Sequence, residues 1–293
     1  MPHVDRYAPS PTSDLHLGNL RTALAGWLLA RTAGGSWRLR VEDLDEARVR
    51  AAAGVEARQL ADLRALGLDW DGEVVRQSER LDAYRDAVAG LPTYECFCTR
   101  RELAAAASAP HEDYRPYPGT CRRLTAAERA ERRATRRPAL RVDAGGERFT
   151  IADVHAGEVT AVVDDFVLVQ GGGQFAYNLA AVVDDVAMGV SFITRGADLL
   201  SSAPRQAWLT SRLGGRPATY AHIGLVTNAQ GARLAKRDGA VGLNAFAAPA
   251  DAFALLSASL GLGPCRTTKE ALAAMPGDQR FFDGAVWDGG TLS

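Results

Sequence analysis

The chain has 293 residues, 47% of them hydrophobic, and a formal net charge of −1 at pH 7. This length allows one large domain with an insertion, or two domains. The balanced charge excludes a general attraction to nucleic acid, so an RNA contact would need a local basic patch. Charged residues interrupt the N-terminus and no long apolar run is present, so we expect no signal peptide, no membrane association and a cytoplasmic location.

A proline-containing turn precedes the first expected helix. Pro9 and Pro11 hold the chain extended, because the residue before a proline avoids the helical region. Ser13 or Asp14 is expected to cap the helix, and free N–H groups at a helix start favour anions. His16 can donate a further hydrogen bond there, which indicates a phosphate site. The helix itself is predicted by leucines at helical spacing, namely Leu17, Leu20, Leu24 and Leu28.

An alternation of apolar and polar residues predicts the next strand. Trp37, Leu39 and Val41 alternate with polar residues, and the pattern ends in the acidic run 42–45. The carboxyl ends of strands in an open α/β sheet face the ligand crevice, so this run is expected beside a bound ligand. Helices are expected to follow over residues 47–67 and 79–90.

The composition changes at residue 91, where prolines, cysteines and tyrosines become frequent and an arginine-rich stretch follows. This change indicates an insertion between two halves of a parallel sheet. Further strands are expected over 160–163, 166–169 and 190–194, and the last delivers Arg195 at its end.

Three of the four cysteines lie close together in the sequence, which favours a metal site over disulfides. Cys96, Cys98 and Cys121 supply three thiolates, and one oxygen or nitrogen ligand would complete a tetrahedral zinc site. The alternative is that the cysteines are reduced and packed among apolar residues without a metal.

A cluster of arginines follows the cysteines and is the strongest local basic patch of the chain. It could contact an RNA phosphate backbone. Alternatively, it forms a solvated helix face that includes Glu128 and Glu131 in side-chain pairs of the i,i+4 type. The arginines are Arg122, Arg123, Arg129, Arg132, Arg133, Arg136 and Arg137.

Eight short motifs follow one another over residues 3 to about 240, at 6–19, 38–45, 66–70, 77–80, 177–185, 194–196, 204–206 and 233–240. In this order they resemble the glutamyl-type class I aminoacyl-tRNA synthetases; the turn at His16 resembles the "HIGH" element and the last motif the "KMSKS" loop. The resemblance implies an α/β fold with a Rossmann-type parallel sheet, an inserted zinc-containing subdomain and a short, partly helical C-terminal region. The corresponding division is a first catalytic half over 1–90, an acceptor-binding-like insertion over 91–175, a second catalytic half over 176–245 and a C-terminal region over 246–293.

The resemblance also implies roles for individual residues. His16 and Lys236 would be catalytic, since activation of a carboxylate by ATP depends on positioning and charge neutralisation. ATP would be bound by His16, Gly18, Asn19, Arg233 and Lys236. Glutamate would be bound by Arg6, Ala8, Ser10, Glu42, Tyr177 and Arg195. Zinc would be bound by Cys96, Cys98, Tyr117 and Cys121, with Tyr114 or His111 as alternatives to Tyr117.

The residues themselves leave other interpretations open. A guanidinium suits a substrate carboxylate, but Arg6 and Glu42 could instead pair with each other, and Tyr177 could be a core aromatic. The chain also departs from the family pattern: Asn19 replaces the last histidine of "HIGH", and Ala181 replaces an asparagine seen in some glutamyl enzymes. In the "KMSKS"-like loop Arg233 and Ala235 replace a lysine and a serine.

The length of the chain after Lys236 is too short for the helical anticodon-reading region of a full glutamyl-tRNA synthetase. This truncation resembles the glutamyl-queuosine tRNA(Asp) synthetases. The resemblance implies that glutamate is activated with ATP and magnesium without tRNA, then transferred to queuosine in the anticodon of tRNA(Asp), by a protein we expect to be monomeric. The alternatives are a minimal glutamyl-tRNA synthetase that charges the 3′ end, and a catalytically silent tRNA-binding paralogue.

Overall fold

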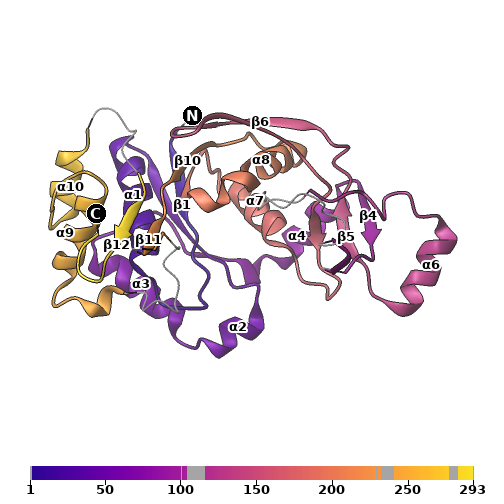
Figure 1. Cartoon of the computed structure of the whole chain (residues 1–293), viewed down its shortest axis with the longest axis horizontal. Helices are drawn as coiled ribbons and strands as arrows, with labels where there is room; N and C mark the ends of the chain where they lie inside the picture. The colour runs from indigo at the N-terminus through magenta and orange to yellow at the C-terminus, as the bar shows by residue number, and fades with distance from the viewer. Residues whose placement is uncertain are drawn as a thin grey trace.

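The structure, a computed structural model, describes residues 2–99, 101–103, 116–228, 230–231, 241–276 and 283–292. Figure 1 shows an elongated molecule with parallel strands in its middle. Helices α9 (Pro249–Ser259) and α10 (Thr268–Ala274) lie at one end, and α6 (Ala126–Thr135) lies at the other. Within the described ranges, no helix combines the length and the apolar character needed to cross a bilayer.

Two groups of strands make up the central layer. The first has the order β1 (Val4–Tyr7), β2 (Ser36–Val41), β3 (Val75–Arg76), all parallel. In the second, β9 (Phe192–Gly196), β10 (Thr219–Ile223) and β6 (Arg148–Asp153) are parallel, and β7 (Gly157–Val162) is antiparallel at the edge. The expected α/β fold with a parallel sheet is confirmed.

The two groups of strands meet at β1 and β9. The backbone N–H of Ser191 donates to the carbonyl of Val4 at 3.0 Å. The buried carboxylate of Asp5 accepts hydrogen bonds from the backbone N–H of Thr194 at 3.2 Å and from its hydroxyl at 2.6 Å. Burial raises the pKa of Asp5 to about 7. These bonds hold the two halves in one layer although a long insertion separates them in sequence.

Helices cover both faces of this layer. Helix α1 (Leu17–Thr32) packs with α9 against Phe192, while α8 (Ala203–Arg212) packs in a separate core against Ile193. The two side chains are adjacent on β9 and so point to opposite faces. The four leucines that predicted α1 are all fully buried. The other helices are α2 (Glu46–Ala51), α3 (Val55–Ala65), α4 (Leu81–Ala89) and α7 (Tyr177–Ala187).

Two expectations about helices were wrong in detail. The helix expected over 47–67 is two helices: the first ends at Ala51, and Gly54, whose φ is +76°, precedes the second as its N-cap. The cap of α1 is His16, not Ser13 or Asp14. The expected helix over 79–90 is observed as α4, preceded by a single 3₁₀ turn.

The segment between α4 and α7 folds in two parts. β4 (Thr93–Cys96), β5 (Ala139–Val142) and β8 (Val167–Val169) form an antiparallel sheet in that order. The β6–β7 hairpin is not part of this sheet; its strand β6 pairs with β10 in the central layer. Near the C-terminus, β12 (Ala285–Trp287) pairs in parallel with β11 (Val226–Asn228).

The approach of Gly224 to Gly284 brings β12 to β11. A Cβ on Gly224 would lie 2.0 Å from the backbone nitrogen of Gly284. We expect Gly224→Ala to lower the free energy of unfolding by about 1–3 kcal/mol, because backbone must move to relieve the overlap. Urea denaturation measures the change. Gly290→Ala is the matched control, since a Cβ there meets open space; equal midpoints for the two variants would contradict the role of this contact.

Candidate active site

A cleft of about 580 Å³ lies at the carboxyl ends of β1 and β2 and at the start of α1. It brings together every residue of the described part that was predicted to bind glutamate or ATP: Arg6, Ala8, Ser10, His16, Gly18, Asn19, Glu42, Tyr177 and Arg195. Arg233 and Lys236 lie outside the described residues. Thr22, Thr194, Asp198 and Val226 also line the cleft, and the sequence motifs did not single them out as ligand contacts.

His16 closes the N-terminus of α1. Its Nδ1 accepts the backbone N–H of Gly18 at 3.1 Å and of Asn19 at 3.4 Å, and its own N–H donates to Oδ1 of Asn19 at 3.2 Å. Because Nδ1 accepts, the proton of the neutral imidazole is on Nε2. Gly18 is needed for this geometry, since a Cβ there would lie 3.0 Å from the imidazole. His16 can therefore donate from Nε2.

The helix start offers fewer free donors than expected. The N–H of Leu17 donates to the carbonyl of Val241 at 2.9 Å, and that of Leu20 donates to the carbonyl of His16 at 3.0 Å. With Gly18 and Asn19 bonded to His16, all four N–H groups of the first turn have partners. The anion-binding capacity of this turn thus rests on the helix dipole and on His16 Nε2.

The contact with Val241 also fixes one end of the segment 232–240. The chain re-enters the described residues at Val241, beside His16, and Gly242 forms a β-bridge with His16. At the other end, Gly231 donates to the carbonyl of Asn228, at the end of β11. Of the described residues that flank 232–240, Val241 and Gly242 therefore lie beside His16.

A buried charge network underlies the residues predicted to bind glutamate. Asp185 of α7 accepts from Arg6 Nε at 3.0 Å and from Arg40 Nη1 at 2.5 Å. Arg40 Nη2 also donates to Glu42 at 3.0 Å. Arg6 and Glu42 thus have different primary partners and do not form the direct pair considered above. Although burial opposes it, Arg6 and Arg40 hold the pKa of Asp185 below its ordinary value.

Arg40 was missed as a functional residue. Its place in the alternating strand pattern predicts a solvent-facing side chain, yet it is fully buried. The acidic pair Asp184 and Asp185 on α7 was the available signal, because two adjacent carboxylates in an apolar helix require buried cations. Asp184 accepts hydrogen bonds from Gln77 at 3.0 Å and Tyr84 at 2.8 Å.

Arg195 is held by a second network, which the sequence did not reveal. Its Nε donates to Nε2 of His222 at 2.9 Å, and its Nη1 donates to Gln206 at 2.6 Å. Nδ1 of His222 lies 2.6 Å from Asp153, on β6. Since Nε2 accepts from Arg195, Nδ1 carries the proton and donates to Asp153. Burial, and then the charge of Arg195, lower the pKa of His222 to about 4.

Tyr177 and Ala181 both lie on α7 but differ in exposure to solvent. Tyr177 is 40% exposed, so the alternative that it is a core aromatic is wrong. Ala181, one turn further along α7, is buried and is not among the residues that line the cleft.

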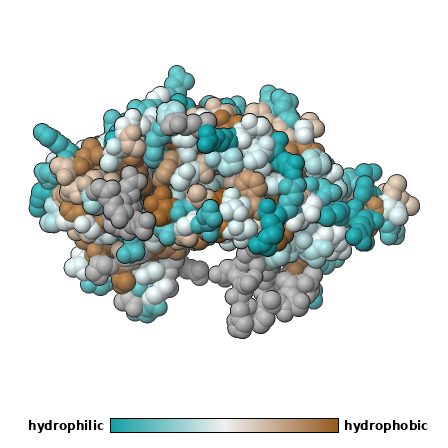
Figure 2. All heavy atoms as spheres, turned by 90° about the horizontal axis from the view of Figure 1, so that it is seen from above, coloured by the Kyte–Doolittle hydropathy of each residue, from teal (hydrophilic) through white to brown (hydrophobic). Residues whose placement is uncertain are grey.

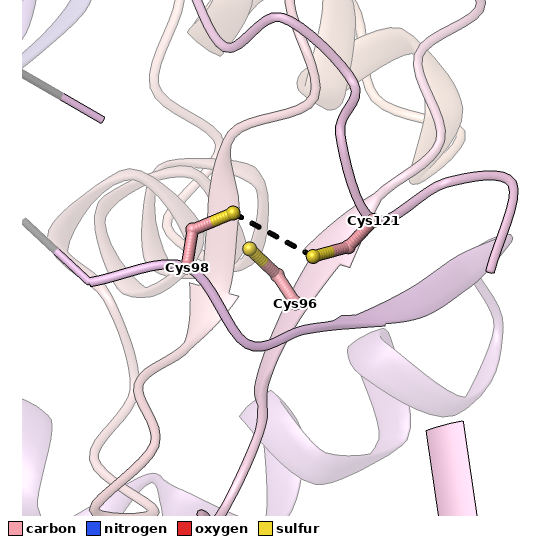
Figure 3. A group of neighbouring side chains, drawn as sticks. All are labelled: Cys96, Cys98 and Cys121. Atoms are coloured by element: carbon pink, nitrogen blue, oxygen red, sulfur yellow. Dashed lines mark hydrogen bonds between the residues drawn. The ribbon is translucent and has the colours of Figure 1, made fainter. Parts of the chain in front are cut away.

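The three clustered cysteines converge. Figure 3 shows the side chains of Cys96, Cys98 and Cys121 pointing toward one another, and their Sγ atoms lie within 4.8 Å of one another. The Sγ atoms of Cys98 and Cys121 are 3.6 Å apart, close to the roughly 3.8 Å expected for two thiolates on one tetrahedral zinc ion. Burial raises the pKa of the Cys98 thiol to about 12. The cluster could hold a metal ion, whose charge would favour the thiolates.

Tyr117 lies at the same cluster. Its hydroxyl oxygen is 3.5 Å from Sγ of Cys96 and 3.6 Å from Sγ of Cys98, and it accepts the backbone N–H of Cys121 at 2.8 Å. These separations match those between an oxygen and sulfur ligands of one tetrahedral ion, about 3.5 Å. Tyr114 and His111 lie outside the described residues.

Several arginines of the basic cluster have structural partners. Arg122 Nε donates to Asp165 at 2.8 Å, and Arg133 Nε donates to Glu95 at 2.8 Å. Glu128 accepts the backbone N–H of Thr125 at 2.7 Å in the capping box of α6. Figure 2 shows hydrophilic residues gathered over the end of the molecule that carries α6. An RNA contact here stays a prediction.

Comparison with known proteins defines the class. A family model described as "tRNA synthetases class I (E and Q), catalytic domain" matches residues 4–256. A crystal structure of the glutamate-tRNA synthetase of Elizabethkingia anophelis has a TM-score of 0.81 at 25% identity, covering 99% of this chain and 68% of that one. Together with the parallel sheet and its cleft, these matches define the catalytic domain of a class I aminoacyl-tRNA synthetase.

Relatives of higher identity narrow the assignment. A protein of Cutibacterium acnes named glutamyl-Q tRNA(Asp) synthetase is 61% identical over 240 residues, which cover 82% of this chain and 69% of the relative. A protein of the same name from Nocardia farcinica is 56% identical over 278 residues, which cover 92% and 88%. The chain belongs to the glutamyl-Q tRNA(Asp) synthetase family.

The depressed pKa of His222 has a consequence for stability. The ordinary pKa is 6.5 and the folded value is about 4, so between these values the unfolded chain binds more protons and stability rises with pH. We expect His222→Asn to remove up to about 1.4 kcal/mol per pH unit of this slope. Urea denaturation of both proteins between pH 4 and 6.5 measures it. The raised pKa of Asp5 lowers stability as the pH rises, but it does so equally in the wild-type protein and the variant. Parallel curves of stability against pH for the two proteins would contradict the buried, neutral state of His222.

Proposed function

We propose that this protein activates glutamate with ATP and transfers it to queuosine in the anticodon of tRNA(Asp). The observation that carries the proposal is the convergence of the glutamate-binding residues and His16 in one cleft. The name of the relatives in this family supports both the amino acid and the acceptor.

Glutamate would bind between the two arginines. Among the described residues, Arg6 uses Nε for its hydrogen bond to Asp185, so both terminal nitrogens are available for a two-pronged contact with a carboxylate. Glu42 shares one oxygen with Arg40, and we assign its other oxygen to the substrate ammonium. Arg195 supplies the cation for the second carboxylate, with Ala8, Ser10 and Tyr177 shaping the site.

The phosphates of ATP would lie at the start of α1. His16 would donate from Nε2 to a phosphate oxygen. The backbone N–H groups of Gly18 and Asn19 hold the imidazole in place through the cap, at the positive end of the helix dipole. Lys236, helped by Arg233, would neutralise charge as pyrophosphate leaves. Magnesium would accompany ATP. The contacts of Val241 with Leu17 and of Gly242 with His16 support this part of the proposal.

We also propose that zinc occupies the cysteine cluster, with Tyr117 as the fourth ligand, and that the chain acts as a monomer. Three thiolates and an oxygen form a closed tetrahedral site of the structural kind. The four-part division at residues 90, 175 and 245 is proposed with it, the second part being the zinc-containing subdomain.

The direct test supplies ATP and labelled glutamate to three purified tRNAs. They are tRNA(Asp) with queuosine, the same tRNA with guanosine at that position, and tRNA(Glu). We expect label only on the queuosine form. Label on the 3′ end of tRNA(Glu) would indicate a minimal charging synthetase, and no label together with tRNA binding would indicate a silent paralogue.

The metal proposal has its own test. We expect about one zinc ion per chain by elemental analysis, and loss of the ion with a lower melting temperature in Cys98→Ser, because metal binding adds directly to folding stability. Cys265→Ser is the matched control, since this thiol is outside the cluster. Unchanged zinc content in Cys98→Ser would refute the site.

A further inference from the structure

A second cavity, of about 680 Å³, adjoins the cleft. Ser10, Glu42 and Tyr177 line both. The glutamate site therefore has one side that includes His16 and another that opens into the second cavity. A transfer reaction requires two such sides, because the acceptor must reach the acyl carbon while the leaving phosphate occupies a different direction.

The walls of the second cavity carry groups that suit a nucleobase. Gln170 and Gln174 are exposed, and within the described residues neither amide side chain has a hydrogen-bond partner. Phe175 is half-buried and is held by an edge contact with Tyr84, with ring centroids 5.3 Å apart. A fixed aromatic ring and free amides are what proteins use to stack and read single-stranded RNA bases.

A tight turn presents these groups. The N–H of Gln170 donates to the carbonyl of Gln174, and that of Gly173 donates to the carbonyl of Gln170, each at 2.8 Å. The amide of Gln174 lies over Gly172, because a Cβ on Gly172 would lie 2.4 Å from Oε1 of Gln174. An alanine at Gly172 would therefore displace this amide.

The rim of the cavity carries charged side chains of both signs, namely Asp45, Glu46 and Arg50. Asp45 and Glu46 begin α2, and Asp45 accepts the N–H of Arg48 as the helix cap. The Glu46 side chain is 81% exposed and its nearest described cation, Arg50, is 3.9 Å away. An ion pair this exposed contributes little to stability, so the Glu46 carboxylate can also bind a cation that enters the cavity.

We propose that this cavity holds the acceptor nucleoside, an RNA base whose hydroxylated ring is attached through a protonated amine. The inference rests on the proposed function and gives it a second binding site. Phe175 stacks on the base, Gln170 and Gln174 bond its edge, and Glu46 attracts the amine. A ring hydroxyl then attacks the glutamyl carbonyl of the adenylate. The new ester C–O bond forms as the acyl–phosphate bond breaks, and the hydroxyl proton passes to the phosphate of the departing AMP.

The test separates activation from transfer. Gln174→Ala and Gly172→Ala should each reduce kcat/KM for queuosine-bearing tRNA(Asp) by about tenfold, the value of one lost base-edge contact. Glutamate-dependent exchange of pyrophosphate into ATP, measured on the same samples, should stay at the wild-type rate and shows that the variants are folded. Glu46→Gln should weaken transfer more than Glu158→Gln, a matched control on the exposed β6–β7 hairpin outside both cavities.

The outcomes distinguish the two proposals. Reduced transfer with normal exchange in both glutamine-site variants supports the second cavity. Wild-type transfer by both variants overturns the cavity assignment and leaves the proposed function standing. Absence of transfer by the unaltered protein overturns the proposed function and this inference with it.

Discussion

The buried guanidinium of Arg40 is the constraint on which the half of the cleft proposed to bind glutamate depends. Removing such a charge from water costs several kcal/mol unless it is paired, and Arg40 finds its partners in Asp185 and Glu42. Because Asp185 also binds Arg6, one network fixes β1, β2 and α7 relative to one another. Asp184 extends this network, because its carboxylate lies 3.9 Å from Arg40 Nε and also pairs with Arg80. Arg40 is thus surrounded by carboxylates, whereas Arg6 and Arg195 line the cleft itself.

The cleft combines rigid and adjustable parts. His16 is locked by its own helix cap, and Arg195 is locked by His222 and Gln206. By contrast, Gln170 and Gln174 line the adjoining second cavity on a short turn, and their amides have no hydrogen-bond partner among the described residues. This division suits a two-step reaction, since activation needs a fixed geometry for a small substrate. The second step must admit a large RNA and then release it.

Much of this could be predicted from the sequence because the motifs are local. The leucines of α1 and the alternation of β2 depend only on neighbouring residues, and the cleft residues lie inside continuous motifs. The missed residues depend on contacts distant in sequence: Arg40 meets Asp185 across 145 positions, and His222 meets Asp153 across 69. Periodicity cannot report such pairs, because it predicts only which way a side chain points. The cap of α1 was mistaken for a different reason: its contacts are local, but Ser and Asp are the usual capping residues and histidine is not.

The β6–β7 hairpin makes the insertion part of the central layer. It is continuous in sequence with the cysteine cluster, yet through Asp153 and His222 it supports the arginine on the far side of the glutamate site. A chimera that replaced residues 91–175 would therefore keep the support of Arg195 only if the incoming segment carried a carboxylate at the place of Asp153. The part that holds the cysteines could be exchanged with less disturbance if the β6–β7 hairpin were left in place.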